Sequence, residues 1–183
     1  MRFAICEYGA GNVRSVELAL ERLGGVRTDD VENADLAVLP GVGAARAAMD
    51  GLRRRGHDVA LRERVKAGGL VLGICLGLQL ALEASDEDGG VDGLGLLPGR
   101  AVRLSEGRVP RMGWARVGGL GDFYFAHSYA ALTSCATAWS EGIVAEARSG
   151  SFVGCQFHPE KSGTAGARYL AGVVEEARSL SRV

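Results

Sequence analysis

Two short stretches of this sequence hold the residue types needed for acyl transfer through a cysteine. Residues 73–77, GICLG, have the G-x-nucleophile-x-G form of an elbow between a strand and a helix, with Cys75 as the nucleophile. Glycines allow the tight turn, and the helix that follows points its free amide groups at the sulfur. The elbow therefore favours a thiolate and offers the Leu76 amide to an oxyanion. A buried structural cysteine in an ordinary turn is the alternative interpretation.

Residues 155–162, CQFHPEKS, supply the other groups that a cysteine nucleophile requires. His158 can take the thiol proton and return it to a leaving group, and Glu160 can orient the imidazole. At positions i and i+2 of an extended segment, the two side chains are expected to share a face. Taken alone, the pair would also fit a surface histidine beside a solvated glutamate.

The remaining histidines are weaker candidates for the base. His127, in FYFAHSY, follows an aromatic strand and has no carboxylate within a few residues, so we expect it to line the site or the core. His57 lies between charged neighbours at a predicted helix start and is expected to be exposed.

The LPGVG stretch at residues 39–43 ends a predicted strand with two glycines, which let the backbone approach a ligand closely. In open α/β sheets, ligands bind beyond the carboxyl ends of the strands. We therefore expect LPGVG to face the GICLG elbow, although a plain turn would explain LPGVG equally well.

The composition indicates a globular protein with one domain over residues 1–183. A net charge of -1 gives no electrostatic reason to expect a nucleic acid or an anionic membrane as partner. No apolar run approaches the roughly 18 residues of a membrane span, and the start of the chain has no signal-peptide core. The four cysteines lack a C-x-x-C pair, so we expect no metal or redox site and a reducing, cytoplasmic location.

The order of predicted elements indicates an α/β fold with an open, mostly parallel central sheet flanked by helices. Apolar strands are expected at 2–8, 34–40 and 69–74. Helices are expected from 13 to 23, around 49–52, at 58–67 and from 75 to 85. After residue 93, short pieces read as antiparallel strands: LGLLPG, RAVRL, MGWARV, DFYFAHSY and GIVAEAR. A last strand, FVGCQF, precedes a helix over 164–179.

Taken in order, PGVG, GICLGLQ, FYFAHSY and QFHPEKS resemble the class I, triad-type glutamine amidotransferases, from about residue 3 to residue 170. The resemblance implies a flavodoxin-like fold and a glutaminase without a cofactor. The elbow and HPE are shared by all triad-type glutaminases. YGAGN, PGVG, MGW and FYFAHSY look closest to the glutaminase subunits of imidazole glycerol phosphate synthase, in histidine biosynthesis.

The resemblance also implies roles for individual residues. Cys75 would be the nucleophile, His158 the base and acid, and Glu160 its orienting carboxylate. Two backbone amides would bind the oxyanion, those of Gly43 and Leu76. Four positions would hold glutamine: Gly41, Gln79, Ser128 and Tyr129. Three residues would lie toward the partner of the glutaminase: Asn12, Trp114 and Lys161.

The implied partner is a cyclase subunit, which forms a heterodimer with the glutaminase and uses its ammonia to make imidazole glycerol phosphate and aminoimidazole carboxamide ribotide. The flexible PGVG strand suggests that a peptide there flips to complete the oxyanion hole when the partner is loaded. Arg111 and Ala115 depart from the family, which often has His and usually has Asn at these positions. These departures concern the partner interface rather than the triad.

Other functions remain open at this point. A triad glutaminase for anthranilate, GMP or pyridoxal phosphate synthesis would share the same catalytic motifs. A cysteine hydrolase or chaperone of the related superfamily would share the elbow without needing His158 and Glu160. A catalytically silent regulatory subunit would not require an intact triad.

Overall fold

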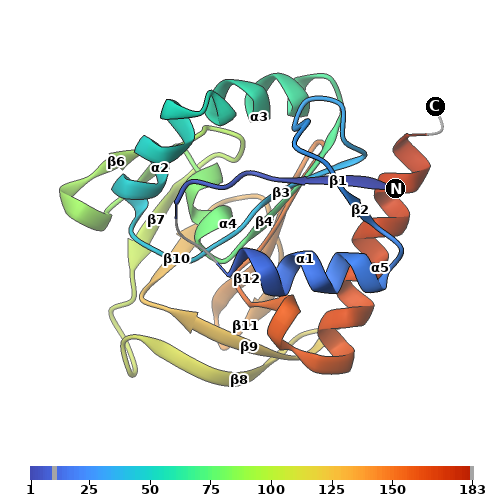
Figure 1. Cartoon of the computed structure of the whole chain (residues 1–183). Coiled ribbons are helices and arrows are strands. Elements are labelled where there is room, and N and C mark those ends of the chain that lie inside the picture. The colour runs from blue at the N-terminus through green and yellow to red at the C-terminus, as the bar shows by residue number, and fades with distance from the viewer. Residues whose placement is uncertain (10–11, 182–183) are drawn as a thin grey trace.

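The computed structural model describes residues 1–9 and 12–181 (Figure 1). Ala10 and Gly11 of the YGAGN stretch, and the last two residues of the predicted domain, lie outside the described residues. The helices are α1 (Val13–Arg22), α2 (Ala45–Arg54), α3 (His57–Lys66), α4 (Leu76–Ala81) and α5 (Gly163–Leu180), with 3-10 turns η1 (Glu87–Gly89) and η2 (Pro159–Lys161).

A central sheet runs through the molecule in the order β11-β12-β13-β4-β3-β1-β2. Its strands are β1 (Arg2–Ile5), β2 (Val26–Arg27), β3 (Leu36–Leu39), β4 (Leu70–Ile74), β11 (Ala136–Ser140), β12 (Ile143–Ser149) and β13 (Phe152–Cys155). The strands from β13 to β2 are parallel, whereas β12 and β11 continue the sheet antiparallel. The predicted α/β class, with a mostly parallel sheet and antiparallel strands in the second half, is confirmed.

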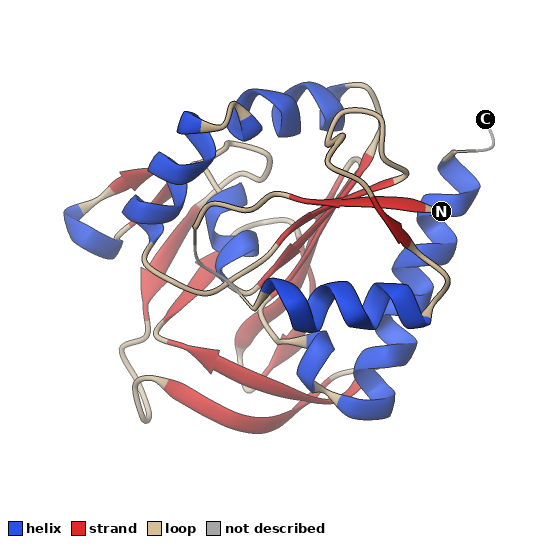
Figure 2. Cartoon of the chain, in the orientation of Figure 1, coloured by secondary structure: helices blue, strands red, loops and turns tan. Residues whose placement is uncertain are grey.

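Two smaller sheets extend the fold. One has the order β10-β7-β5-β6, formed by β5 (Ala84–Ser85), β6 (Val91–Asp92), β7 (Arg100–Arg103) and β10 (Tyr129–Leu132). The other is the antiparallel pair β8 (Arg111–Val117) and β9 (Gly121–His127). The four-stranded sheet packs beside α4, whereas β9 contacts α5 and η2 (Figure 2).

The central sheet separates two hydrophobic cores, because successive side chains along a strand point to opposite faces. On one face Ala4 and Val71 pack with Met49 of α2 and Leu61 of α3. On the other face Phe3 packs in a cluster with side chains of α1 and α5. Figure 1 shows these two helix layers on either side of the sheet.

Three local predictions are wrong. The helix after the elbow ends at Ala81 rather than continuing to residue 85, and LGLLPG (94–99) is a loop rather than a strand. The loop amides of Leu94 and Leu96 donate to carbonyls at the end of α4 (2.7 and 2.8 Å), so the loop satisfies the open end of this helix. DFYFAHSY is divided at Ser128 between β9 and β10, which belong to different sheets.

Among the described residues, no helix is long and apolar enough to span a membrane.

Candidate active site

Cys75 lies at the turn between β4 and α4, in the elbow that the sequence predicts. Its φ of 51° and ψ of −104° are unusual for a non-glycine residue, and such backbone strain is common at functional sites. A Cβ atom at Gly77 would lie 2.0 Å from the Leu39 carbonyl oxygen, so no larger residue fits this turn. The Cys75 amide donates to the Cys155 carbonyl oxygen at 2.7 Å, which fixes the elbow to the end of β13.

His158 and Glu160 lie together just beyond β13. The imidazole Nδ1 and the carboxylate Oε1 are 2.9 Å apart, and the two side chains are 2% and 1% exposed. The predicted extended segment is wrong, because Pro159 starts the 3-10 turn η2 and only His158 has an extended backbone. The turn is held in place by Ser162, whose hydroxyl donates to the His158 carbonyl oxygen at 2.6 Å.

The charge state of His158 follows from this environment. Burial lowers the pKa of the imidazole, but hydrogen bonds with Cys75 and Glu160, together with their negative charges, raise it to about 9. The imidazole is therefore protonated at neutral pH. Because Nδ1–H donates to Glu160, the Nε2 nitrogen is available to exchange a proton with Cys75. This is the arrangement of a Cys-His-Glu triad.

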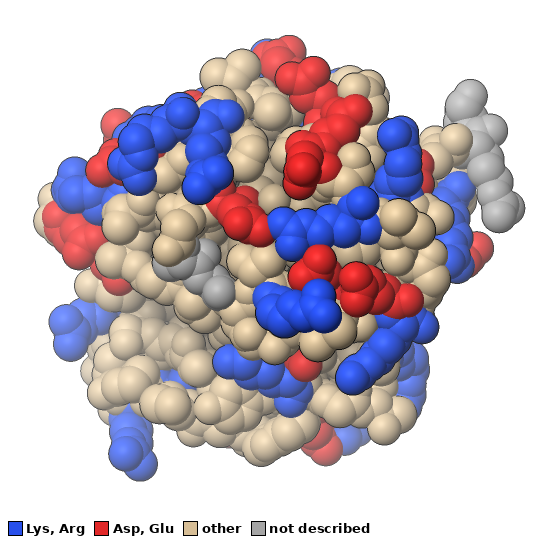
Figure 3. Space-filling model, in the orientation of Figure 1, with Lys and Arg blue, Asp and Glu red and all other residues tan. Residues whose placement is uncertain are grey.

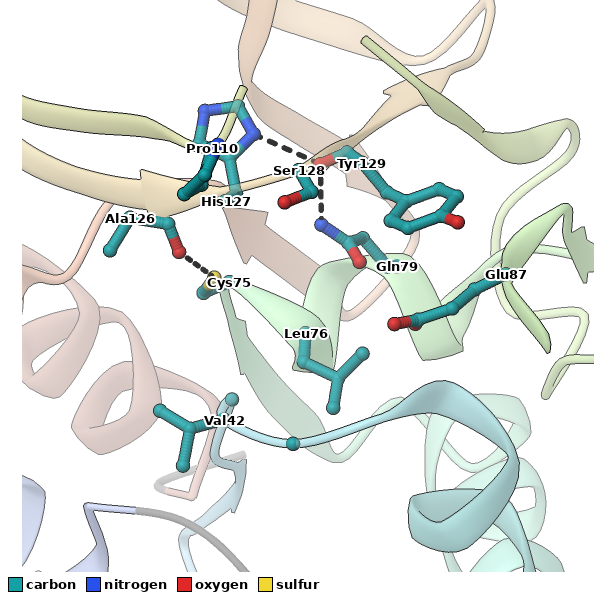
Figure 4. Close-up of a pocket in the computed structure, with 12 residues that line it drawn as sticks. Val42, Cys75, Leu76, Gln79, Glu87, Pro110, Ala126, His127, Ser128 and Tyr129 are labelled. Carbon is teal, nitrogen blue, oxygen red and sulfur yellow. Dashed lines mark hydrogen bonds between the residues drawn. The ribbon is translucent and has the colours of Figure 1, made fainter. Parts of the chain in front are cut away.

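A cavity of about 220 Å³ opens beside Cys75 (Figure 4). It is smaller than the roughly 300–1,000 Å³ of pockets for drug-sized ligands, and its size suits a single amino acid. The oxyanion and substrate residues expected from the sequence all line this cavity: Gly41, Gly43, Leu76, Gln79, Ser128 and Tyr129. His158 and Glu160 are outside the lining.

The LPGVG segment packs directly against the elbow, as expected. A Cβ atom at Gly41 would lie 1.7 Å from the Ile74 carbonyl oxygen and 2.4 Å from the Leu76 amide nitrogen, so glycine is required there. The Tyr8 hydroxyl holds the segment, lying 2.7 Å from the Pro40 carbonyl oxygen. The amide of Leu76, at the first position of α4, has no acceptor within its helix and is available to a bound oxyanion.

Gln79 presents an oxygen to the cavity. Its Nε2 group donates one hydrogen bond to the Tyr129 carbonyl oxygen (2.7 Å) and another to Gln156 Oε1 (3.1 Å). Both amide protons are thereby used, so Oε1 remains free as an acceptor. Figure 4 shows the Gln79 nitrogen turned toward Tyr129 and its oxygen turned away from that hydrogen bond.

Glu87 also lines the cavity, although the sequence patterns do not single it out. Its Oε2 accepts a hydrogen bond from the Ala45 amide at the start of α2 (3.0 Å), and burial raises the pKa of the carboxyl. Glu87 lies in the acidic run SDEDGG, where nothing distinguishes it from its solvated neighbours. Val42, Pro110 and Ala126 complete the lining, and the Ala126 carbonyl oxygen accepts a hydrogen bond from the Cys75 thiol at 3.8 Å.

The two other histidines have different environments. His127 lines the cavity, and its Nδ1 lies 2.9 Å from the Tyr129 carbonyl oxygen, so Nδ1 carries the proton. Burial lowers the pKa of His127 to about 4, which keeps the ring neutral and unsuited to pair with a thiolate. His57 starts α3 but is half-buried, so the expectation that it is exposed is wrong.

The residues expected at a partner interface lie around η2. Lys161 is exposed at the end of this turn, and η2 contacts both α1, which Asn12 precedes, and β9. Trp114 on β8 is 60% exposed and meets the Tyr124 ring of β9 edge-on, at 6.3 Å between centroids. Figure 3 shows few charged side chains on the lower part of this face, where Figure 1 labels β8.

Among the described residues, no group of histidine, cysteine, aspartate and glutamate side chains is arranged to hold a metal ion.

Comparison with known proteins agrees with this geometry. Residues 12–176 match the family described as glutamine amidotransferase class-I. The HisH subunit of imidazole glycerol phosphate synthase from Carboxydothermus hydrogenoformans is 41% identical, over 93% of this chain and 98% of that protein. This chain belongs to the class I glutamine amidotransferase family, in its HisH branch. The HisH subunit from Bacillus velezensis is 42% identical, over 91% of this chain and 92% of that protein.

Solved structures share the fold at much lower sequence identity. A structure described as a glutamine amidotransferase superposes with a TM-score of 0.77 at 22% identity, covering 96% of this chain and 98% of that chain. The structure of PurLQS from Thermotoga maritima gives a TM-score of 0.70 at 18% identity, covering 96% of this chain and 98% of that chain. These similarities show that this chain has the class I amidotransferase fold.

Proposed function

We propose that this chain is the glutaminase of an imidazole glycerol phosphate synthase, hydrolysing glutamine and delivering the ammonia to a cyclase subunit in histidine biosynthesis. The observation that carries the proposal is the buried His158–Glu160 pair, which accompanies a cysteine at a strained elbow. Cys75 also lines a cavity of amino-acid size. Family membership supports the same activity.

In the first half of the reaction, the Cys75 thiolate attacks the side-chain amide carbon of glutamine. A carbon–sulfur bond forms, and the carbonyl oxygen becomes an oxyanion that accepts hydrogen bonds from the Leu76 and Gly43 amides. The protonated His158 then gives its Nε2 proton to the amide nitrogen. The carbon–nitrogen bond breaks, and ammonia leaves a glutamyl thioester on Cys75.

In the second half, water hydrolyses the thioester. Neutral His158 removes a proton from the water, whose oxygen attacks the thioester carbon and forms a second oxyanion. The carbon–sulfur bond breaks, glutamate is released, and the thiolate is again paired with an imidazolium. Glu160 stabilises that imidazolium throughout and keeps Nδ1 protonated.

The cavity supports glutamine as the substrate. The free Oε1 of Gln79 and the carboxylate of Glu87 are both suited to the α-ammonium group. Together with the backbone at Gly41, Ser128 and Tyr129, they would hold the main-chain end of glutamine while the side chain reaches Cys75.

A partner is required because ammonia released into water is protonated and lost as a nucleophile. We propose that the cyclase subunit forms a heterodimer with this chain at Asn12, Trp114 and Lys161, and that the complex is cytoplasmic, where free cysteines persist. The exposed apolar side chains of Met112 and Trp114 on β8, 64% and 60% exposed, support an interface there. We further propose that loading of the partner flips a peptide of the PGVG segment.

The function is tested by labelling Cys75 with a glutamine-analogue electrophile and by measuring glutamate release, in wild type and Cys75→Ala. The matched control is Cys155→Ala, which removes a buried thiol next to the site that takes no part in the reaction. We expect labelling and hydrolysis to disappear only in Cys75→Ala. Absence of labelling in the wild-type complex would refute the glutaminase assignment. Equal, high glutaminase rates with and without the partner's nucleotide ligand would refute the peptide flip.

A further inference from the structure

Gln156 touches the nucleophile from inside the protein. It follows β13, its side chain is fully buried, and its Nε2 group lies 3.4 Å from Cys75 Sγ with the geometry of a donor. Its backbone amide donates to the Ala145 carbonyl oxygen of β12 at 2.9 Å, so the residue is fixed just past the carboxyl end of β13. Neither half of the glutaminase reaction described above uses this side chain.

The direction of the Gln156 amide is imposed by its neighbours. A backbone carbonyl can only accept, so the Tyr129 carbonyl oxygen requires the Nε2 end of Gln79 to face it, at 2.7 Å. The second proton of the same Nε2 group then points to Gln156 and requires its oxygen, at 3.1 Å. With Oε1 bound to Gln79, the NH₂ group of Gln156 is turned toward the sulfur.

The neutral His127 side chain reinforces this orientation of the two glutamine amides. Its Nδ1–H group donates to the same Tyr129 carbonyl oxygen at 2.9 Å, so this oxygen accepts from two side chains and both of its lone pairs are used. Figure 4 shows both hydrogen bonds converging on Tyr129. Reversal of either glutamine amide would bring two oxygens or two NH₂ groups together in a buried site, which is costly.

We propose that Gln156 is a positioning residue that donates a hydrogen bond to the Cys75 thiolate, in an orientation set by the Tyr129 carbonyl through Gln79. The proposal deepens the glutaminase function and rests on Cys75 being its nucleophile. A donor aimed at sulfur stabilises the negative thiolate more than the neutral thiol, because hydrogen bonds to charged acceptors are the stronger ones. The chain of hydrogen bonds through Gln79 and Gln156 also connects the glutamine-binding backbone at Tyr129 to the nucleophile.

The test is the pH dependence of Cys75 alkylation by iodoacetamide, without glutamine, in wild type and in Gln156→Glu, Gln156→Leu and Gln79→Leu. Iodoacetamide is uncharged and reacts with the thiolate, so the rate reports the thiolate directly and does not need turnover. Peptide mass spectrometry separates the four cysteines. Cys135, which is partly exposed and distant in the chain, is the internal control in every sample.

We expect Gln156→Glu to slow Cys75 alkylation at neutral pH by roughly 10- to 100-fold and to move its pH midpoint upward, since an oxygen acceptor replaces the donor. Gln156→Leu should slow it by about tenfold, and Gln79→Leu by about fivefold, the equivalent of one neutral hydrogen bond. Among the described residues Gln79 makes no hydrogen bond to the sulfur, so an effect of Gln79→Leu on the pH midpoint would have to pass through Gln156. Alkylation of Cys135 should be unchanged.

A profile for folded Gln156→Glu within twofold of wild type would overturn the proposal. If Gln156→Glu does not fold, as judged by circular dichroism, Gln156→Leu and Gln79→Leu decide in the same way, and unchanged profiles in both overturn it. Failure of the glutaminase assignment would be recognised by a different observation. The wild-type protein would then show a normal alkylation profile but would release no glutamate in the presence of its partner.

Discussion

Replacing Glu160 by glutamine tests whether the carboxylate sets the charge state of His158. The two side chains are buried and 2.9 Å apart, and the carboxylate is one of two groups that raise the pKa of His158 to about 9 against burial. Loss of its charge should lower this pKa by roughly one to two units, which equals about 1.5–3 kcal/mol of imidazolium stabilisation. Because the imidazolium is the acid that expels ammonia, the loss in kcat/KM should be largest at alkaline pH. At pH 9 about half of the wild-type imidazole is protonated but only about a tenth or less of the variant's, so kcat/KM should fall roughly 5- to 50-fold there.

The structure also indicates how Glu160→Gln affects stability apart from charge. Oε2 of Glu160 is buried and has no hydrogen-bond partner among the described residues. With the amide oxygen of the variant facing Nδ1–H of His158, the new NH₂ group lies at this position without an acceptor. The wild type already leaves a buried, unsatisfied oxygen there, so the variant exchanges one unsatisfied atom for another and the midpoint of thermal unfolding should change little from this cause.

The assay is the initial rate of glutamate release by the complex with its partner between pH 6 and pH 9. The alkaline limb, where His158 loses its proton, should move to lower pH by one to two units in Glu160→Gln. Glu146→Gln is the matched control, since Glu146 is a buried carboxylate on β12 that bonds Thr137 and Arg148 instead. An alkaline limb that stays within half a unit of wild type in Glu160→Gln would refute the reasoning.

Two further predictions concern the residues around the cavity. Gly41→Ala would place a Cβ atom 1.7 Å from the Ile74 carbonyl oxygen, so the 39–43 segment must move away from the elbow. We therefore expect the variant to lose glutaminase activity. Retained activity would show that the close approach is unnecessary. Burial lowers the pKa of His127 to about 4, below its unfolded value of about 6.5, so its contribution to stability is complete above pH 6.5 and is lost as the pH falls to 4. Urea unfolding should therefore show the free energy of unfolding of the wild type falling by up to roughly 3 kcal/mol relative to that of His127→Asn over this window. Parallel curves of unfolding free energy against pH for the two proteins would contradict this prediction.

Much of the fold could be predicted because its signals are local. The apolar strands and the helical spacing in the first half predict α1, α2 and α3 and the parallel sheet, since periodicity reports which face is buried. The second half was harder, because LGLLPG is apolar enough for a strand yet is used to satisfy the end of α4. That use depends on a neighbour distant in the sequence, which no local pattern encodes.

The sequence by itself predicted the chemistry of this protein, because GICLG and HPE together supply a nucleophile, a base and an orienting carboxylate. Only the tertiary structure decided which groups surround Cys75. Glu87 comes from a turn in an acidic run, Gln156 from the end of a strand, and His127 from a break between sheets, and these elements meet only in the folded chain. The directions of the Gln79 and Gln156 amides, in particular, follow from the position of one backbone carbonyl, which no spacing of residues could predict.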